Sequence, residues 1–116
     1  MVWISLDPQS GREQAGRRPA LVLSPASYNG PVGLALFCPI TSQAKGYPFE
    51  VPLPEGQAVS GVVLADHVKC LDWRSRFAES AGDAPESVVA EVVRRLGLLV
   101  GLALPMPVIG PDSESR

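Results

Sequence analysis

The chain is poor in the residues that most metal and acid–base sites use. Its 116 residues include a single histidine, His67, so two imidazoles cannot exchange protons in one site. Its two cysteines, Cys38 and Cys70, are far apart and lack the C-x-x-C spacing of zinc sites. We therefore expect no metal and no cofactor. Both cysteines lie in apolar, strand-like runs, which favours buried free thiols in a reduced protein.

Long apolar runs are also missing. Residues 96–109 are apolar, but two glycines and two prolines interrupt them, and they fall short of the ~20 residues of a spanning helix. The first seven residues have neither the charged start nor the apolar stretch of a signal peptide. These features predict a cytoplasmic protein without a membrane partner.

Aromatic residues make up only 6% of the chain although hydrophobic residues make up 46%, so valine, leucine and alanine must build most of the core. The length suits one domain. We expect that domain at residues 1–103, followed by a flexible C-terminal tail at residues 104–116, which is rich in proline and polar residues.

Short apolar segments between turn residues predict a mainly β protein. An Asn-Gly pair within residues 28–31 predicts a hairpin turn. The next segment, 32–40, is apolar nearly throughout and is expected to be buried on both faces, whereas prolines place residues 49–53 near a sheet edge. The other expected strands are residues 2–6, 19–25, 61–65, 68–71 and 76–79, a spacing typical of a small barrel or sandwich.

A C-terminal helix is expected after Asp83. Asp83 is the expected N-cap, with Glu86 as its capping-box partner and Pro85 in the first turn. Apolar side chains then recur every three or four residues, which predicts an amphipathic helix packed on the sheet. The expected core side chains are Val88, Val89, Val92, Val93, Leu96, Leu99 and Val100.

Two polar, glycine-containing segments, residues 11–19 and 41–48, each follow a predicted strand. The net charge of −2 argues against a nucleic-acid partner. The first segment, however, carries three arginines against one acid, so a local basic patch can form on an acidic body. Together the segments hold the groups needed to bind a phosphodiester and to move protons around it.

RNA cleavage needs no metal, because the 2′-OH is the nucleophile and arginine can supply positive charge. Arg18 precedes a proline at the mouth of a strand, and its forked donors suit two phosphate oxygens. Thr41 could direct its hydroxyl at a phosphate oxygen or the 2′-OH, and Glu13 could accept a proton. Gln14 and Lys45 could contact the RNA backbone. For an isolated arginine or threonine, a turn residue or a surface ion pair is the commoner explanation.

Four stretches of sequence resemble the MazF/PemK family of toxin endoribonucleases. They are WISLDP at residues 3–8, GREQAGRRPALVLSP at 11–25, PITSQAKGYPFEV at 39–51 and GVVLADHVKCLDWR at 61–74. The resemblance runs in order from about residue 3 to residue 102, and only the tail lies outside it.

This resemblance implies an α+β fold, mainly β with a C-terminal helix, around the small SH3-like barrel of the MazF, PemK and CcdB toxins. It implies a homodimer that cleaves single-stranded RNA, including mRNA, at a short sequence without metal, and so inhibits translation and growth. The products would be a 2′,3′-cyclic phosphate and a 5′-hydroxyl. The expected partner is a MazE-like antitoxin whose acidic, partly disordered tail covers the RNA groove.

The resemblance also suggests roles for residues. The family's catalytic arginine falls on Arg18 and its catalytic threonine on Thr41. Asp66 matches an acid proposed to act in some members, but the arginine that those members have two residues earlier is Leu64 here. The expected catalytic residues are Arg18, Thr41 and Glu13, and the expected RNA contacts are Gln14, Arg17, Ser42, Lys45 and Asp66.

Two other functions use the same fold. A toxin of this fold binds DNA gyrase and cleaves nothing, and a barrel can also serve only as a protein-interaction module. A gyrase binder has no need of Arg18 and Thr41 in these contexts, and an interaction module would tolerate alanine in both polar segments.

Overall fold

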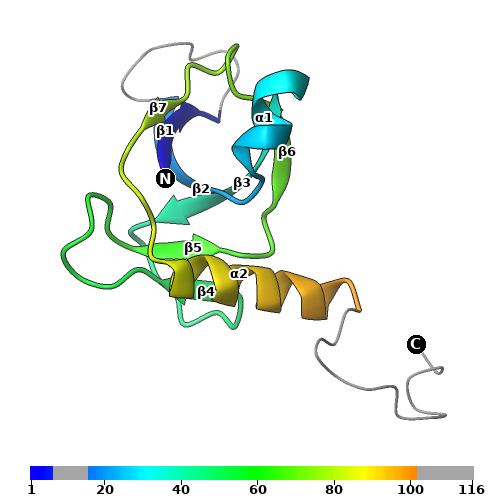
Figure 1. Ribbon diagram of the computed structural model, residues 1–116. Helices are drawn as coiled ribbons and strands as arrows, with labels where there is room; N and C mark the ends of the chain where they lie inside the picture. Colours follow the sequence, from blue (N-terminus) through cyan, green and yellow to red (C-terminus); the bar gives the residue numbers. More distant parts are fainter. Residues whose placement is uncertain (7–15, 102–116) are drawn as a thin grey trace, which may run out of the picture.

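The computed structural model describes residues 1–6 and 16–101, in which seven strands form an antiparallel sheet and two helices pack against it (Figure 1). The elements are β1 (Val2–Ser5), β2 (Arg17–Val22), α1 (Ala26–Val32), β3 (Leu34–Thr41), β4 (Glu50–Pro52), β5 (Val62–Leu64), β6 (Lys69–Asp72), β7 (Glu79–Ser80) and α2 (Glu86–Leu99).

The longest strand, β3, organises the sheet. Neighbouring strands follow the order β4-β5-β3-β2-β1-β7, and β6 also pairs with β3. The start of β3 pairs with β6 and its end pairs with β5, so two short strands follow each other along one side of β3 while β2 occupies the other. The result is a strongly curved, open sheet of the SH3-like barrel type, and β4 lies at an edge as its prolines predicted.

Two apolar clusters lie on opposite faces of β2 and β3, because successive residues of a strand point to opposite sides. Ala20 and Phe37 belong to a cluster with Ile4 of β1 and Ala35. The next residues along the two strands, Leu21 and Cys38, belong to a larger cluster beneath α2. The buried members of this cluster are Leu21, Cys38, Ile40, Val51, Val59, Val63, Ala65, Ala81, Val88 and Val92. The middle of β3 is buried on both faces, at Phe37 and Cys38, but Leu36 is exposed and Pro39 and Thr41 are only half-buried, so the prediction of burial on both faces holds for only part of the strand.

The hairpin turn predicted at residues 28–31 is wrong, because these residues lie within helix α1. The N–H groups of Tyr28 and Asn29 both donate to the Pro25 carbonyl oxygen, and the Asn29 amide donates to the carbonyl of Ser24. The left-handed residue that ends the segment is Gly33, with φ of 80°. The Asn-Gly pair thus lies inside a helical turn, and the chain reverses after it.

Helix α2 begins later than predicted and without the predicted cap. Pro85 occupies the N-cap position in an extended conformation, and no side chain caps the helix. Glu86 lies in the first turn, where its charge complements the helix dipole. Asp83 is therefore not the cap, and the capping-box prediction is wrong.

The buried face of α2 is also narrower than the apolar pattern predicted. Only Val88 and Val92 are buried, whereas Val93 is 52% exposed and Val100 is 71% exposed. The helix packs on the sheet through its first turns and then continues past β4 (Figure 1). The periodicity of apolar residues correctly predicted the helix, but it could not predict how far along the helix the sheet continues to cover it.

The last strand, the cysteines and the C-terminal tail were the other features predicted from the sequence. The last predicted strand, 76–79, is displaced to Glu79–Ser80. Both cysteines are free, but Cys70 is exposed, contrary to prediction, whereas burial raises the pKa of the Cys38 thiol to about 11. Neither described helix is long and apolar enough to cross a bilayer. The tail predicted at 104–116 lies outside the described residues.

Candidate functional site

Arg18 and Thr41 are brought together by the pairing of β2 with β3. Ala20 lies opposite Pro39 in this antiparallel pair, and continuing the register by two residues brings Arg18 level with Thr41. Residues opposite each other in such a pair project to the same face. Both line one hollow of about 640 Å³, which Ser42 also lines.

The backbone around Thr41 fixes its hydroxyl. The Oγ1 atom accepts a hydrogen bond of 3.1 Å from the backbone N–H of Gln43, which leaves the hydroxyl proton for donation to another group. Thr41 pairs with Val62 of β5, and Gly61 lies directly against its carbonyl. The threonine therefore has a defined position at the end of β3.

The two consecutive arginines of β2 have opposite environments. The Arg18 side chain is exposed, and its Nη1 donates to the backbone oxygen of Arg17 at 3.0 Å. The Arg17 side chain is only 7% exposed. Its Nη2 donates to the carbonyls of Trp3 and Phe77 at 3.1 and 2.7 Å and to the Glu79 carboxylate at 2.9 Å.

Arg17 therefore ties β1, β2 and β7 together from within. Although it lines the edge of the hollow, a guanidinium so enclosed presents little surface to a ligand. These bonds give Arg17 a structural role, and its contact with RNA stays a prediction. The sequence could not distinguish the two adjacent arginines. They differ in burial because successive residues of a strand point to opposite faces of the sheet.

A second hollow of about 570 Å³ adjoins the first. Thr41 and Gln43 line both, and Lys45, Tyr47 and His67 line only the second. Among the charged residues that the structure describes in the two linings, Arg17, Arg18 and Lys45 are cationic, and Glu50 is the one carboxylate. The Glu50 oxygens accept hydrogen bonds from the backbone N–H groups of Lys45 and Gly46, in the loop just before β4. We call these two adjoining hollows the groove; its charge suits an extended anion.

Asp66 lies beneath this loop and belongs to neither lining. Its Oδ2 accepts a 2.7 Å hydrogen bond from the Tyr47 hydroxyl, and its Oδ1 is 3.7 Å from His67 Nε2. The hydrogen bond to this carboxylate raises the pKa of Tyr47, because an anion disfavours the phenolate. Asp66 thus holds a groove residue in place.

The structure brings together Arg18, Thr41, Ser42 and Lys45 of the predicted site. Glu13 and Gln14 lie outside the described residues. Gln43, Tyr47 and Ser60 also line the groove; the sequence linked their two loops, residues 42–48 and 57–60, to the choice of RNA bases but gave none of the three an individual role. The first two belong to the second polar segment, so their position there was an available signal. Among the described residues, no three His, Cys, Asp or Glu side chains are grouped to hold a metal ion.

An open antiparallel barrel with an arginine, a threonine and a lysine along one groove has the features of a small protein that binds an extended anion. The chain belongs to the family of PemK-like, MazF-like toxins of type II toxin–antitoxin systems, whose family model matches residues 1–100.

Particular relatives agree with this membership. The endoribonuclease toxin MazF of Escherichia coli strain K12 is 46% identical over 101 residues, which cover 87% of this chain and 90% of the relative. A crystal structure of MazF from Deinococcus radiodurans is 63% identical, with a TM-score of 0.79 and coverage of 87% of this chain and 92% of the other. A MazE–MazF complex from the same organism is 58% identical, with a TM-score of 0.78 and coverage of 88% and 91%.

Proposed function

We propose that this chain is the toxin of a type II toxin–antitoxin system and an endoribonuclease that cleaves single-stranded RNA at a short sequence. The observation that carries the proposal is the joint placement of Arg18 and Thr41 in one groove, in a chain 46% identical to an endoribonuclease toxin. Cleavage of mRNA would stop translation and growth.

The groove has the properties that a phosphodiester requires. Arg18 is exposed and carries a forked guanidinium, which suits two non-bridging phosphate oxygens. Thr41 has a hydroxyl proton to donate, since its oxygen already accepts from Gln43. Lys45 is exposed farther along the groove, where a neighbouring phosphate would lie.

The proposed reaction is an internal transesterification. The 2′-oxygen loses its proton to a base and attacks phosphorus, and the bond from phosphorus to the 5′-oxygen breaks. The 5′-oxygen takes up a proton, so the products are a 2′,3′-cyclic phosphate and a 5′-hydroxyl. Arg18 stabilises the negative charge that develops on the non-bridging phosphate oxygens, Thr41 orients an oxygen of the reacting group, and Glu13 is the proposed base.

The main alternative is a toxin of the same fold that binds DNA gyrase. It is disfavoured because the curated relatives include the endoribonucleases MazF and PemK, at 46% and 35% identity. It also assigns no task to the exposed arginine beside Thr41. The plain interaction module leaves the cationic groove equally unexplained.

The proposed partners follow from the same site. A cationic groove can be covered by an acidic antitoxin tail, and a related MazF was crystallised with MazE. We propose a homodimer that acts in the cytoplasm, where its RNA substrate and its antitoxin are found.

The test is a cleavage assay on a long single-stranded RNA in EDTA, followed by mapping of the 5′ ends. We expect wild-type protein to cut at one short motif and Arg18→Ala to cut roughly 10²- to 10³-fold more slowly, the scale of losing one charge stabiliser. Arg74→Ala is the matched control, because Arg74 is an exposed arginine that stacks on Trp73 outside the groove.

Circular dichroism should show that both variants fold. Cleavage by Arg18→Ala at the wild-type rate would refute the assignment of Arg18. Intact RNA with folded wild-type protein would refute the endoribonuclease proposal, and gyrase inhibition would then be measured.

A further inference from the structure

The loop of residues 42–49, between β3 and β4, lines the groove, and we call it the groove loop. Its residues 45–47 wrap around the side chain of Glu50. Its carboxylate accepts hydrogen bonds from the backbone N–H groups of Lys45 at 2.9 Å, Gly46 at 3.0 Å and Tyr47 at 3.2 Å. Gly46 has φ of 77°, which turns the consecutive N–H groups toward one point. Successive amides arranged in this way form a concave anion site, and here the chain supplies its own anion.

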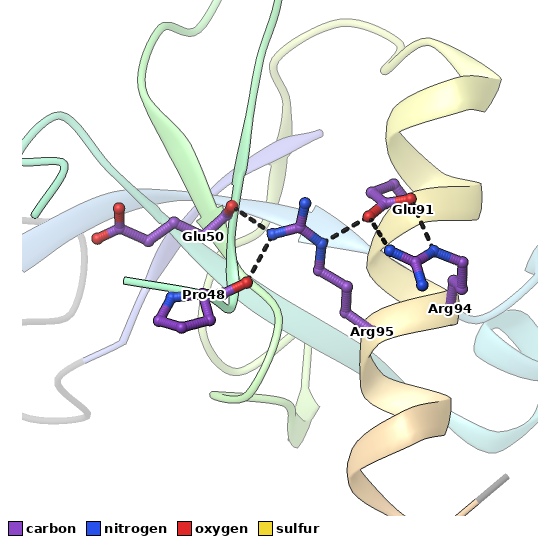
Figure 2. A network of polar contacts seen from close by, with 5 residues as sticks. All are labelled: Pro48, Glu50, Glu91, Arg94 and Arg95. Atoms are coloured by element: carbon purple, nitrogen blue, oxygen red, sulfur yellow. Dashed lines mark hydrogen bonds and ion pairs between the residues drawn. The ribbon is translucent and has the colours of Figure 1, made fainter. Parts of the chain in front are cut away.

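Arg95 of α2 holds the same loop from outside. Figure 2 shows its guanidinium between the helix and the loop. Its Nη1 donates to the carbonyl oxygens of Pro48 at 2.6 Å and Glu50 at 2.9 Å, and its Nε donates to Glu91 at 2.6 Å. The Arg95 side chain is 27% exposed, so these bonds are partly shielded from water. One guanidinium thereby links the helix to both sides of the loop's final turn.

The neighbouring arginine has no such reach. Arg94 donates two hydrogen bonds to Glu91, at 3.0 and 2.7 Å, and its side chain is 56% exposed (Figure 2). These bonds and the one from Arg95 lower the pKa of Glu91 to about 2, so the acceptor stays ionised at neutral pH. Both arginines share Glu91, but only Arg95 is bonded to the loop.

We propose that Arg95 and Glu50 are positioning residues for RNA binding: they fix the loop so that Lys45 and Tyr47 face the groove. This inference rests on the proposed function and deepens it. It assigns α2 a role in substrate affinity that its amphipathic pattern alone does not suggest.

The positioning should affect affinity more than the chemical step. Lys45 and Tyr47 depend on the Glu50 and Arg95 bonds for their backbone conformation. Thr41 is held instead by pairing with Val62. Loosening the loop therefore weakens binding of RNA while the reacting groups keep their positions, which predicts a higher KM and an unchanged kcat.

The experiment compares Arg95→Met with Arg94→Met. Each removes one guanidinium that pairs with Glu91, and only the first also removes the two bonds to the loop carbonyls. We expect Arg95→Met to raise KM for a cleavable RNA about tenfold with kcat within about twofold of wild type. Arg94→Met should leave both constants unchanged, and Arg95→Lys should recover part of the affinity.

Amide hydrogen exchange provides a second readout that needs no RNA. We expect the amides of Lys45, Gly46 and Tyr47 to exchange at least about tenfold faster in Arg95→Met than in Arg94→Met. Should Arg95→Met fail to fold, Glu50→Gln tests the same loop through its other anchor, and the same rise in KM and in exchange is expected.

Equal KM values and equal exchange in the two methionine variants would overturn the inference while leaving the endoribonuclease intact. A fall in kcat at unchanged KM would also overturn it. Failure of the wild type to cleave RNA would instead refute the proposed function, and exchange at residues 45–47 would still decide whether Arg95 anchors the loop.

Discussion

Gly61 lies against the backbone of Thr41, where β5 begins beside the end of β3. Its φ is +122°, a conformation that essentially only glycine adopts. A methyl group there would lie 2.2 Å from the Thr41 carbonyl oxygen. Because the obstacle is backbone and not a flexible side chain, relief requires movement of Thr41 itself.

Gly61→Ala should therefore lower both stability and cleavage. Backbone strain alone costs about 1–3 kcal/mol, and the clash displaces the proposed catalytic hydroxyl. Urea unfolding and RNA cleavage would measure the two losses. Gly30→Ala is the control, because a methyl group at Gly30 meets no atom within 4 Å; equal effects of the two substitutions would contradict the role given to this contact.

At the scale of the element, α2 stabilises the fold through its two buried valines, Val88 and Val92, and not through its whole apolar face. Val92 is fully buried in the larger core cluster, whereas its chain neighbour Val93 is 52% exposed. Burial of apolar area is what stabilises, so equal apolar residues on one helix contribute unequally.

Val92→Ala should lower the free energy of unfolding by about 2 kcal/mol, from lost burial and a residual cavity. Val93→Ala should change it by less than about 0.5 kcal/mol, as is usual at exposed positions. Chemical denaturation of the two variants measures both. A similar loss in each would mean that Val93 is covered in solution, as by a second copy of the chain.

At the scale of the whole molecule, net charge and local charge have opposite signs. The chain carries a net charge of −2. Among the described residues of the groove, however, Arg18 and Lys45 are exposed cations, and the one carboxylate, Glu50, is bound by backbone N–H groups of residues 45–47. The acidic body disfavours non-specific association with polyanions, while the groove favours one strand along its length.

Binding of single-stranded RNA should therefore weaken with salt. The expected slope of log K against log salt concentration is about −0.7 for each phosphate contacted. Titration of wild type with a non-cleavable RNA at several salt concentrations measures it, and Lys45→Met should make the slope shallower by about 0.7 if Lys45 binds one phosphate. An affinity independent of salt would argue against an RNA groove.

The sequence by itself determined the class of fold and predicted the candidate site. Alternating apolar segments predicted most of the strands, and the position of Arg18 and Thr41 next to consecutive strands predicted a shared site. Strand pairing is consistent with that expectation, because its register places both residues at the same end of the sheet. These properties are local, since each depends on residue type and on spacing along one segment.

Only the tertiary structure decided which of two adjacent arginines is buried, where α2 leaves the sheet, and which side chains hold the groove loop. Arg17 finds its partners at Trp3, Phe77 and Glu79, and Arg95 finds its partners at Pro48 and Glu50. Such contacts join residues far apart in the chain, so neither periodicity nor composition specifies them. They depend on how the sheet curves and on where each short element ends.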